Sequence, residues 1–366
     1  MRPPWRPRRG EREGFLTQTL DLLTTALLPG VGPRTVRDIE ARAPLGQALA
    51  RPGEHKDLFG EDARRQIVSG RARRYAEDEL RRASAEGVRI VGRDEADYPA
   101  LLRETYDPPA VLYVRGRLDG TEGERSVAIV GSRAATPEGV ALCRSMACEL
   151  ALSGATIVSG LARGIDTAAH TGALDAQGRT VAVLGSGLDR VYPRENGALA
   201  TQIAGSGAVV TEFPFGTEPS RGHFPRRNRV IAGWARAAVV VEAAARSGAL
   251  VTARVALDEG RDVLAVPGHP SHPGAAGTNA LLRDGATLVR GAADVAEAMG
   301  LVMRVTPDGA PGGDDVLQAL RRDAPSSLEE IARRSGRPAS ELLARLLELE
   351  LSQRVRRLPG ALFTRN

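Results

Sequence analysis

The sequence predicts an α/β protein with a doubly wound parallel sheet, preceded by a small helical domain and followed by a winged-helix domain. Within residues 126–300, short apolar runs rich in β-branched residues alternate with helical runs, the pattern of a parallel sheet. Residues 14–86 show only helical spacing, and a Pro/Gly-rich stretch precedes three short helices and a hairpin. We therefore expect a helical domain at 1–94, the sheet domain at 95–300, a linker at 301–313 and the winged helix at 314–366.

The composition is that of a globular protein with a slight basic excess. Of the 366 residues 42% are hydrophobic, and 50 Lys and Arg against 45 Asp and Glu leave a formal charge of +5. Because this excess is small, affinity for an anionic partner must come from local clustering. Two cysteines and five scattered histidines predict a reducing cytoplasm, no disulfide framework and no zinc. No apolar run is long enough for a membrane span, and residues 1–9 are expected to be disordered.

The helical domain is predicted from leucines spaced three and four apart, at 16, 20, 23 and 27. The hairpin at 28–34, Leu-Pro-Gly-Val-Gly-Pro-Arg, either joins two helices as a plain structural turn or offers backbone amides to a DNA phosphate. Prolines within 97–102 and 107–116 predict that these two segments are extended and lead toward the next domain.

The sheet domain is predicted to contain six strands, at 127–130, 156–158, 180–184, 208–211, 237–241 and 262–266. Ligands of open α/β sheets bind at the carboxyl ends of the strands, so the turns that follow the first two strands are candidate anion-binding turns. They contain Gly131, Ser132 and Arg133, before a helix capped by Thr136, and Gly160, Ala162, Arg163 and Gly164. Glycine admits close backbone approach, free amides point at an anion and arginine adds charge. The alternative is that both are plain packing turns.

The third turn argues against a nucleotide cofactor. Gly185-Ser186-Gly187 imitates a dinucleotide fingerprint, but Arg190 stands where the last glycine should be. The first strand also lacks the fingerprint, and no Gly-x-x-x-x-Gly-Lys-Ser/Thr loop occurs in a chain whose one lysine is Lys56. We therefore expect no nicotinamide, flavin or other cofactor, and no ATPase.

The segment 221–229, Arg-Gly-His-Phe-Pro-Arg-Arg-Asn-Arg, holds four arginines, a histidine and an aromatic residue without any acid. Arginines bind phosphates while Phe224 offers a face to a base, the combination that single-strand binders use. The alternative is a solvated loop before a helix that begins at Arg226, with Phe224 in the core.

The remaining turns favour ligand positioning over catalysis. Neither 242–253 nor 267–270 shows a Ser-His-Asp order or a paired carboxylate. Asp166 and His170, four apart on one helix, are expected to make a helix-surface contact rather than an acid–base pair. The third helix of the tail is acidic, so a protein contact is as well supported there as DNA binding.

Six motifs occur in register between about 98 and 290. They are Ile129–Arg133, Ser159–Asp166 with His170, Gly187–Asp189 with Tyr192 and Pro193, Phe224–Arg229, Ser247 and Gly248 with Thr252 and Ala253, and Pro267 with Gly268. In this combination they resemble the DprA/Smf family of bacterial DNA-processing proteins. The resemblance implies an extended Rossmann-like sheet, a sterile-alpha-motif-like N-terminal domain and a C-terminal winged helix.

The resemblance also implies a non-catalytic function. Members bind single-stranded DNA, form homodimers, load the RecA recombinase onto incoming DNA during natural transformation and displace single-strand-binding protein; a role in repair is the other use. Carried over by motif, Gly131, Ser132, Arg133, Arg163, Arg221, Phe224, Arg227 and Asn228 would line the DNA pocket. The alternative is a related Rossmann-like enzyme that cleaves nucleoside monophosphates. Such enzymes usually carry a Pro-Gly-Gly-x-Gly-Thr turn with a glutamate, which Pro267-Gly268-His269-Pro270 lacks.

Overall fold

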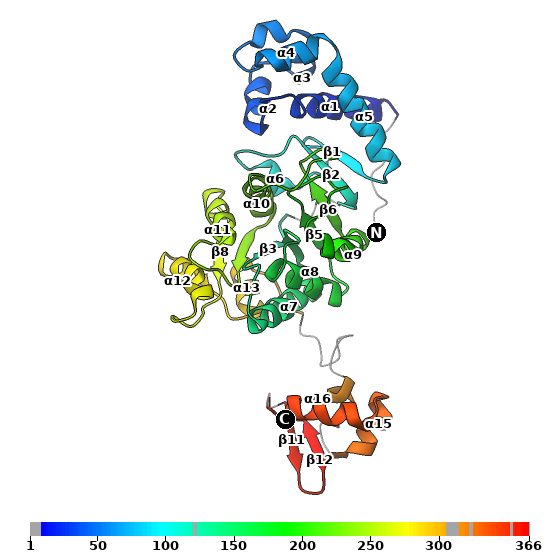
Figure 1. Cartoon of the computed structure of the whole chain (residues 1–366), viewed down its shortest axis with the longest axis vertical. Helices are drawn as coiled ribbons and strands as arrows, with labels where there is room; N and C mark the ends of the chain where they lie inside the picture. The colour runs from blue at the N-terminus through cyan, green and yellow to red at the C-terminus, as the bar shows by residue number, and fades with distance from the viewer. Residues whose placement is uncertain are drawn as a thin grey trace. The chain divides into compact units, whose positions relative to one another are not determined.

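The computed structural model describes residues 9–118, 120, 123–304, 315–321, 325–351 and 354–365 (Figure 1). They belong to two compact units, 1–303 and 304–366. Residues 1–8 of the expected disordered start and 305–313 of the expected linker lie outside the described residues. The domain boundaries drawn from the sequence stay predictions.

Five α-helices form the N-terminal part of the larger unit. They are α1 (Arg9–Ala26), α2 (Pro33–Glu40), α3 (Leu45–Ala50), α4 (Glu61–Val68) and α5 (Arg71–Ala85), with a 3₁₀ turn at Pro52–His55. Leu23 is fully buried, and Leu20 and Leu27 pack against the same core, as their spacing predicts. The helical character of this part is confirmed, and its likeness to a sterile alpha motif stays a prediction.

Nine strands form one sheet in the order β1-β2-β6-β5-β4-β3-β7-β8-β9. They are β1 (Arg89–Gly92), β2 (Val111–Gly116), β3 (Ser126–Val130), β4 (Thr156–Ser159), β5 (Thr180–Val183), β6 (Ala208–Thr211), β7 (Ala237–Val240), β8 (Asp262–Ala265) and β9 (Thr287–Leu288). The six predicted strands, β3 to β8, are all present and parallel. Two strands before the predicted segment add an antiparallel edge to this parallel sheet, because β2 pairs antiparallel with β1 and β6.

The strand β2 was expected only as an extended lead-in. Residues Val111 to Val114 are buried on both faces because the segment pairs with its neighbours as a strand of the sheet. The extended prediction is wrong at 100–102, which belong to the helix α6 (Ala100–Arg103). Proline restricts the residue before it, here Tyr98, and Pro99 at the N-cap leaves the following residues free to form a turn of helix.

Helices cover both faces of the sheet, so the doubly wound prediction is confirmed. They are α7 (Pro137–Leu152), α8 (Ile165–Asp175), α9 (Gly197–Ser206), α10 (His223–Trp234), α11 (Gly248–Asp258), α12 (Ala276–Arg283) and α13 (Ala292–Met299), with 3₁₀ turns at Arg194–Asn196 and Pro273–Ala275. On β3, Val127 and Ile129 join the core beneath α7, α8 and α13, whereas Ala128 and Val130 join the core beneath α10 and α11. This alternation explains why the strand is apolar at every position.

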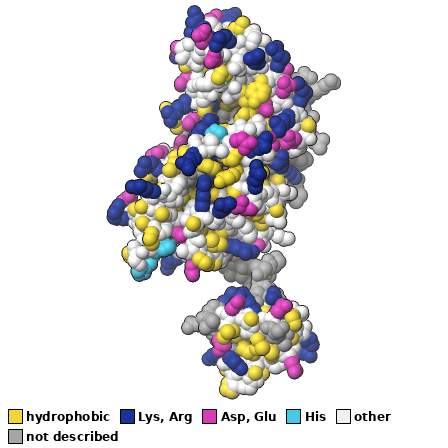
Figure 2. Space-filling view, in the orientation of Figure 1, with side chains coloured by type: hydrophobic (Ala, Val, Ile, Leu, Met, Phe, Trp, Pro, Cys, Tyr) yellow, Lys and Arg dark blue, Asp and Glu magenta, His cyan; other side chains and the backbone are white. Residues whose placement is uncertain are grey.

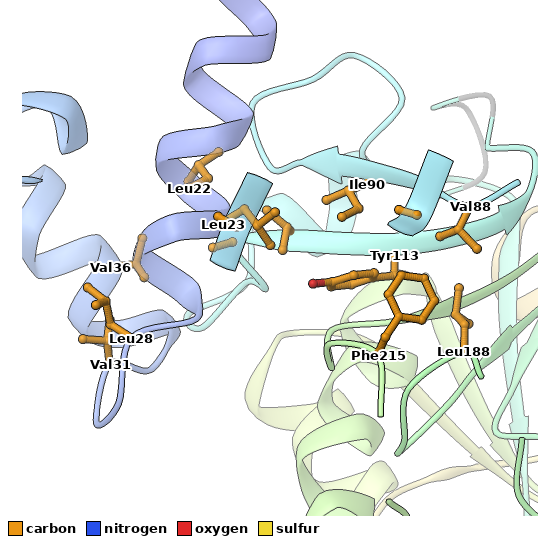
Figure 3. Packing of buried hydrophobic residues seen from close by; sticks show 14 of the residues in the cluster. Leu22, Leu23, Leu28, Val31, Val36, Val88, Ile90, Tyr113, Leu188 and Phe215 are labelled. Carbon is orange, nitrogen blue, oxygen red and sulfur yellow. The ribbon is translucent and has the colours of Figure 1, made fainter. Parts of the chain in front are cut away.

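The helical part is packed on the antiparallel edge of the sheet (Figure 3). Leu22 and Leu23 of α1 share one core with Ile90, Tyr113 and Phe215. The rings of Tyr113 and Phe215 meet edge to face, with centroids 5.5 Å apart. This core fixes the position of the α1–α2 hairpin relative to the sheet.

A buried carboxylate joins the same two parts. The Tyr113 hydroxyl donates to Oε2 of Glu79 on α5 over 2.9 Å, and the Phe215 amide donates to the same oxygen over 3.2 Å. Burial raises the pKa of Glu79, although both donors favour its ionised form. The helical part and the sheet are therefore linked by polar contacts as well as by the apolar core.

The smaller unit is a winged helix, as predicted. It contains α14 (Asp315–Ala319), β10 (Ser326–Ser327), α15 (Leu328–Ser335), α16 (Ala339–Leu351), β11 (Val355–Leu358) and β12 (Leu362–Arg365). The Ser327 hydroxyl caps α15 by accepting from the Glu330 amide, and β11 and β12 form the hairpin expected around Gly360. The unit has its own core, which includes Ile331, Leu346 and Phe363.

Candidate nucleic-acid interface

The turns after β3, β4 and β5 meet the beginning of α10 around a hollow at the carboxyl edge of the sheet, which we call the Phe224 hollow. It is lined by Arg133, Gly160, Ala162, Gly185, Ser186, Tyr192, Pro219, Phe224 and Arg227. In Figure 2, Lys and Arg side chains surround a hydrophobic strip near the middle of the visible face of the larger unit. An edge of this kind is where open α/β sheets place ligands.

The helix α10 begins at His223, three residues before the predicted start. Phe224 and Arg226 therefore lie in its first turn rather than in a solvated loop. Proline is tolerated at Pro225 because the amides of a first helical turn have no partner within the helix. Arg221, just before the helix, is exposed and does not line the hollow.

Phe224 forms a wall of the hollow. Its side chain is half-buried, and a Cβ on Gly185 would lie 3.3 Å from Cδ1 of the ring, so the ring packs directly on glycine backbone. The guanidinium carbon of Arg133 lies 4.8 Å from the ring centroid, and the Tyr192 ring centroid lies 5.9 Å away. Phe224 is thus not a core residue, and its stacking on a base stays a prediction.

Arg227 points inward and is almost fully buried. Its Nη1 donates to the carbonyl oxygens of Gly160 and, over 2.7 Å, of Val183, while its Nε donates to Oδ1 of Asn228 over 3.0 Å. Burial lowers the pKa of Arg227 to about 10, which leaves it charged near neutral pH. Arg227 therefore ties the ends of β4 and β5 to α10, and its place in the DNA pocket stays a prediction.

The turn at 160–164 already holds an anion of its own chain. The amides of Gly160 and Ala162 donate to Oδ2 of Asp166 over 3.2 and 3.3 Å, so the prediction of open amides at these two positions is wrong. Burial raises the pKa of Asp166, whereas the charge of Arg227 and the two amides act in the opposite direction. Arg163 is exposed and pairs with Glu195.

A side chain outside the predicted set shapes this turn. Asn196 donates from Nδ2 to the Leu161 carbonyl over 2.8 Å and to the Thr167 hydroxyl over 2.9 Å. Leu161 has φ +59°, in the left-handed region that side chains seldom adopt. The amide of Asn196 therefore helps to hold a strained residue at the rim of the site.

The turn at 131–133 is also satisfied internally. The Ser132 amide donates to the Glu242 carbonyl over 2.7 Å, and the Thr136 amide and hydroxyl donate to the Glu242 carboxylate over 3.0 and 2.8 Å. The predicted cap of α7 is confirmed, because the Thr136 hydroxyl accepts from the Gly139 amide over 3.1 Å. What this turn presents outward is the exposed side chain of Arg133.

Glycines allow the two turns to touch. Gly164 has φ +73°, and a Cβ there would clash with the Ser132 carbonyl oxygen. A Cβ at Gly131 would lie 2.6 Å from Cγ1 of Ile165. The close approach of backbone to backbone predicted at Gly164 is confirmed, whereas Gly160 makes room for the Arg227 guanidinium and Gly131 for the Ile165 side chain. A direct DNA contact of these glycines stays a prediction.

Asp166 and His170 do not form the predicted surface contact, because both are buried. The Thr180 hydroxyl donates to the Ile157 carbonyl over 2.7 Å, so it accepts from Nδ1 of His170, also over 2.7 Å. Burial lowers the pKa of His170 to about 3, which keeps the imidazole neutral. Their burial was not predicted because the four-residue spacing of two residues on one helix does not show whether that face packs against other elements.

The hollow is also lined by residues outside the predicted site: Gly185, Ser186, Tyr192 and Pro219. Gly185 and Ser186 belong to the turn that does not match the dinucleotide fingerprint. Because this turn follows a parallel strand, its position alone could have indicated that these residues lie at the ligand-binding edge. Asn228 does not line the hollow; its Nδ2 donates to the Gly248 carbonyl over 3.4 Å, at the start of α11. Among the described residues, no cluster of His, Cys, Asp and Glu is arranged to hold a metal ion.

A mostly parallel α/β sheet with an arginine- and aromatic-lined hollow at its carboxyl edge is suited to a ligand that carries phosphates and rings. The chain belongs to the DNA recombination-mediator protein A family, which matches residues 89–300, and the DprA winged helix domain matches residues 304–361. The resemblance to the DprA/Smf family is thereby confirmed. No described helix combines the length and apolar character needed to cross a bilayer.

Named relatives and solved structures agree with this assignment. Protein Smf of Escherichia coli (strain K12) is 40% identical over 284 residues, 74% of this chain and 76% of that protein. The putative DNA processing protein DprA of Mycobacterium tuberculosis (strain ATCC 25618 / H37Rv) is 38% identical over 350 residues, 89% and 86% of the two chains. The X-ray structure of DNA processing protein A from Streptococcus pneumoniae has a TM-score of 0.62 and 31% identity, over 79% of this chain and 98% of that one.

A further structure was solved for its single-stranded DNA binding mode. It is DNA processing protein A from Helicobacter pylori, with a TM-score of 0.53 and 28% identity. The match covers 58% of this chain and 95% of that one.

Proposed function

We propose that the protein binds single-stranded DNA and acts as a recombination mediator. The observation that carries the proposal is the Phe224 hollow, where an aromatic ring, a second aromatic ring and an exposed arginine meet at the sheet edge. Stacking surfaces combined with cations are what sequence-independent single-strand binding requires. The single-stranded DNA binding mode described for the Helicobacter pylori relative supports the same ligand.

The residues at this edge divide into two groups. We propose that Phe224 stacks on a base and that the exposed side chains of Arg133, Arg163 and Arg221 take phosphates. We propose that the other predicted residues shape and support the surface that receives the DNA: Gly131, Ser132, Gly160, Ala162, Gly164, Arg227 and Asn228. Their packing and hydrogen bonds support that role.

The partners proposed for this chain follow from its family. We propose that it acts on incoming DNA during natural transformation, in the cytoplasm, as a homodimer that loads RecA and displaces single-strand-binding protein. Membership of the DNA recombination-mediator protein A family and the similarity to DNA processing proteins support this assignment. Repair is a second setting for the same biochemical step.

The proposed function needs no chemical step. The acid and the histidine of the predicted helix pair are both committed inside the protein, Asp166 to two amides and His170 to Thr180. Glu242 is committed to the cap of α7. These engagements support binding rather than hydrolysis of a nucleotide.

The proposal is tested by RecA filament formation on single-stranded DNA coated with single-strand-binding protein. Wild type should shorten the lag of RecA ATP hydrolysis, and Phe224→Ala should not. A lag unchanged by wild type, together with base release from a nucleoside monophosphate, would favour the hydrolase alternative.

The contribution of the smaller unit is tested by a chain that ends at Met303. Because residues 1–303 form a compact unit with their own cores, this chain should fold and keep its affinity for oligodeoxythymidine. Loss of that affinity in a folded truncated chain would place the DNA site partly in the winged helix.

A further inference from the structure

An exposed tyrosine lies between two arginines where the helical part meets the sheet. The Tyr106 side chain, just after α6, is 57% exposed. The guanidinium carbons of Arg34 and Arg37, both on α2, lie over its ring at 4.9 and 4.7 Å from the centroid. We call these three residues the Tyr106 cluster. A tyrosine ring offers a stacking face, and planar guanidinium groups bind phosphate and stack on bases.

The backbone holds the ring in place without covering it. The Tyr106 amide donates to both carboxylate oxygens of Glu259, over 3.2 and 3.1 Å, and its carbonyl accepts from Nη1 of Arg37. The Arg34 side chain is 68% exposed. A ring that is fixed through its main chain and partly exposed loses little freedom when a base stacks on it in place of one of the two guanidinium groups.

A second hollow lies beside α2, and one of its lining residues belongs to the helix that carries Phe224. Gly32 and Pro33 of the 28–34 hairpin line it together with Pro109, Glu212 and Arg226. Arg226 follows Phe224 by two residues on α10, and its guanidinium carbon lies 4.9 Å from the Phe213 ring centroid. The beginning of α10 is thus common to the surroundings of both hollows.

The charge of this region favours an anion. Arg226 and Arg229 both donate to Glu212, at 3.3 and 2.5 Å, while Asp107 lies 3.8 Å from Arg34 and 4.0 Å from Arg229. Arg37 donates to the Tyr106 carbonyl rather than to a carboxylate, and Arg34 lies 3.8 Å from Asp107 with 68% of its side chain exposed. These two guanidinium groups are the ones placed to meet a phosphate.

We propose that the Tyr106 cluster is a second contact for the same DNA strand. A strand seated in the Phe224 hollow continues past the start of α10, stacks a base on Tyr106 and places phosphates against Arg34 and Arg37. This inference rests on the proposed function and extends it, because it makes the N-terminal helical part a portion of the DNA site. It also gives the 28–34 hairpin a ligand nearby.

The test is affinity as a function of oligodeoxythymidine length, measured by fluorescence anisotropy for lengths of about 4 to 16 nucleotides. The variants are Tyr106→Leu, which keeps apolar bulk but removes the ring, and Arg34→Gln. The matched controls are Tyr75→Leu and Arg81→Gln on α5, whose side chains are 43% and 71% exposed.

Tyr106→Leu should leave the shortest oligomers that bind unaffected and weaken the longest about 5- to 140-fold, the cost of one lost stacking contact. Arg34→Gln should reduce the salt slope by about 0.7 for the long oligomers alone. Both controls should bind like wild type. Tyr106→Phe should keep full affinity, because the ring and not the hydroxyl makes the contact.

Wild-type affinity of Tyr106→Leu and Arg34→Gln at every length would overturn the inference, and so would an equal loss at all lengths. Arg34 is largely exposed, so Arg34→Gln still decides the question if Tyr106→Leu does not fold. If Phe224→Ala instead leaves every length unaffected, the proposed site itself is wrong, and this outcome is distinct from failure of the extension.

Discussion

The contact between Arg133 and Phe224 makes a quantitative prediction about how charge and stacking combine at the site. The Arg133 guanidinium lies 4.8 Å from the Phe224 ring centroid. Of the four arginines in the predicted DNA pocket, Arg227 is buried and bonded to backbone carbonyls, which leaves three exposed ones. On an oligomer too short to reach the Tyr106 cluster, three phosphate contacts predict a slope of log affinity against log salt of about −2.1.

The single substitutions should separate the two effects. Arg133→Ala should change the slope to about −1.4, so that raising salt from about 50 to 200 mM weakens binding about 7-fold instead of about 18-fold. Phe224→Ala should lower affinity by about 1–3 kcal/mol at each salt concentration with little change of slope, because stacking releases no counterions.

The double variant tests whether the ring positions the guanidinium. An exposed cation–π contact contributes about 0.5–1 kcal/mol, so the double variant should lose that much less than the sum of the single losses. The assay is fluorescence anisotropy with labelled oligodeoxythymidine at several salt concentrations, with circular dichroism to verify folding. Additive losses with all three slopes equal to that of wild type would refute the reasoning.

Three further predictions concern the surroundings of the site. Glu195→Gln should release Arg163 from its ion pair and raise affinity for oligodeoxythymidine about two- to fivefold, and unchanged affinity would contradict this. Burial lowers the pKa of His170 from 6.5 to about 3. As the pH falls below 6.5, His170 therefore becomes protonated in the unfolded state but stays neutral in the folded state, which favours unfolding. The wild-type free energy of unfolding should therefore include a loss of about 2 kcal/mol between pH 7.5 and 5 that His170→Gln lacks, measured by urea unfolding; equal losses in both proteins would exclude this source. Gly164→Ala should lower the melting temperature clearly more than Gly216→Ala, since both glycines have positive φ but a Cβ at Gly216 would meet open space, and equal shifts would show that the close approach is unimportant.

Much of the fold follows from local patterns that the structure leaves intact. The six parallel strands are continuous apolar runs because helices cover both faces of the sheet, and such runs are visible in the sequence. Thr136 followed by Pro137 specifies the start of α7 by itself, through a side-chain cap and a fixed φ. The antiparallel edge was not predicted because β2 forms by pairing with β1 and β6, and nothing in the local sequence of 111–116 identifies these distant partners.

The site was predictable in its position and less so in its internal contacts. The sheet topology alone brings the turns after β3 and β4 together, so Arg133 and Gly160 were placed on one edge correctly. That Asp166 occupies the Gly160 and Ala162 amides depends on the path of the turn, which bends at Leu161. Arg226 is exposed and Arg227 is buried because neighbouring residues of a helix point to different sides. Which of the two faces inward depends on how α10 is rotated on the sheet, and the sequence did not show where α10 begins.

The most direct test of the central claim is competition between single-stranded and duplex DNA for one bound probe. Labelled oligodeoxythymidine on the full chain is displaced by unlabelled oligodeoxythymidine or by blunt duplex of the same length, at one salt concentration. Because the Phe224 hollow offers a stacking face and phosphate contacts but no reader of base edges in a groove, single strands of any sequence should displace the probe at far lower concentration than duplex. Equal or more effective displacement by the blunt duplex would contradict the account.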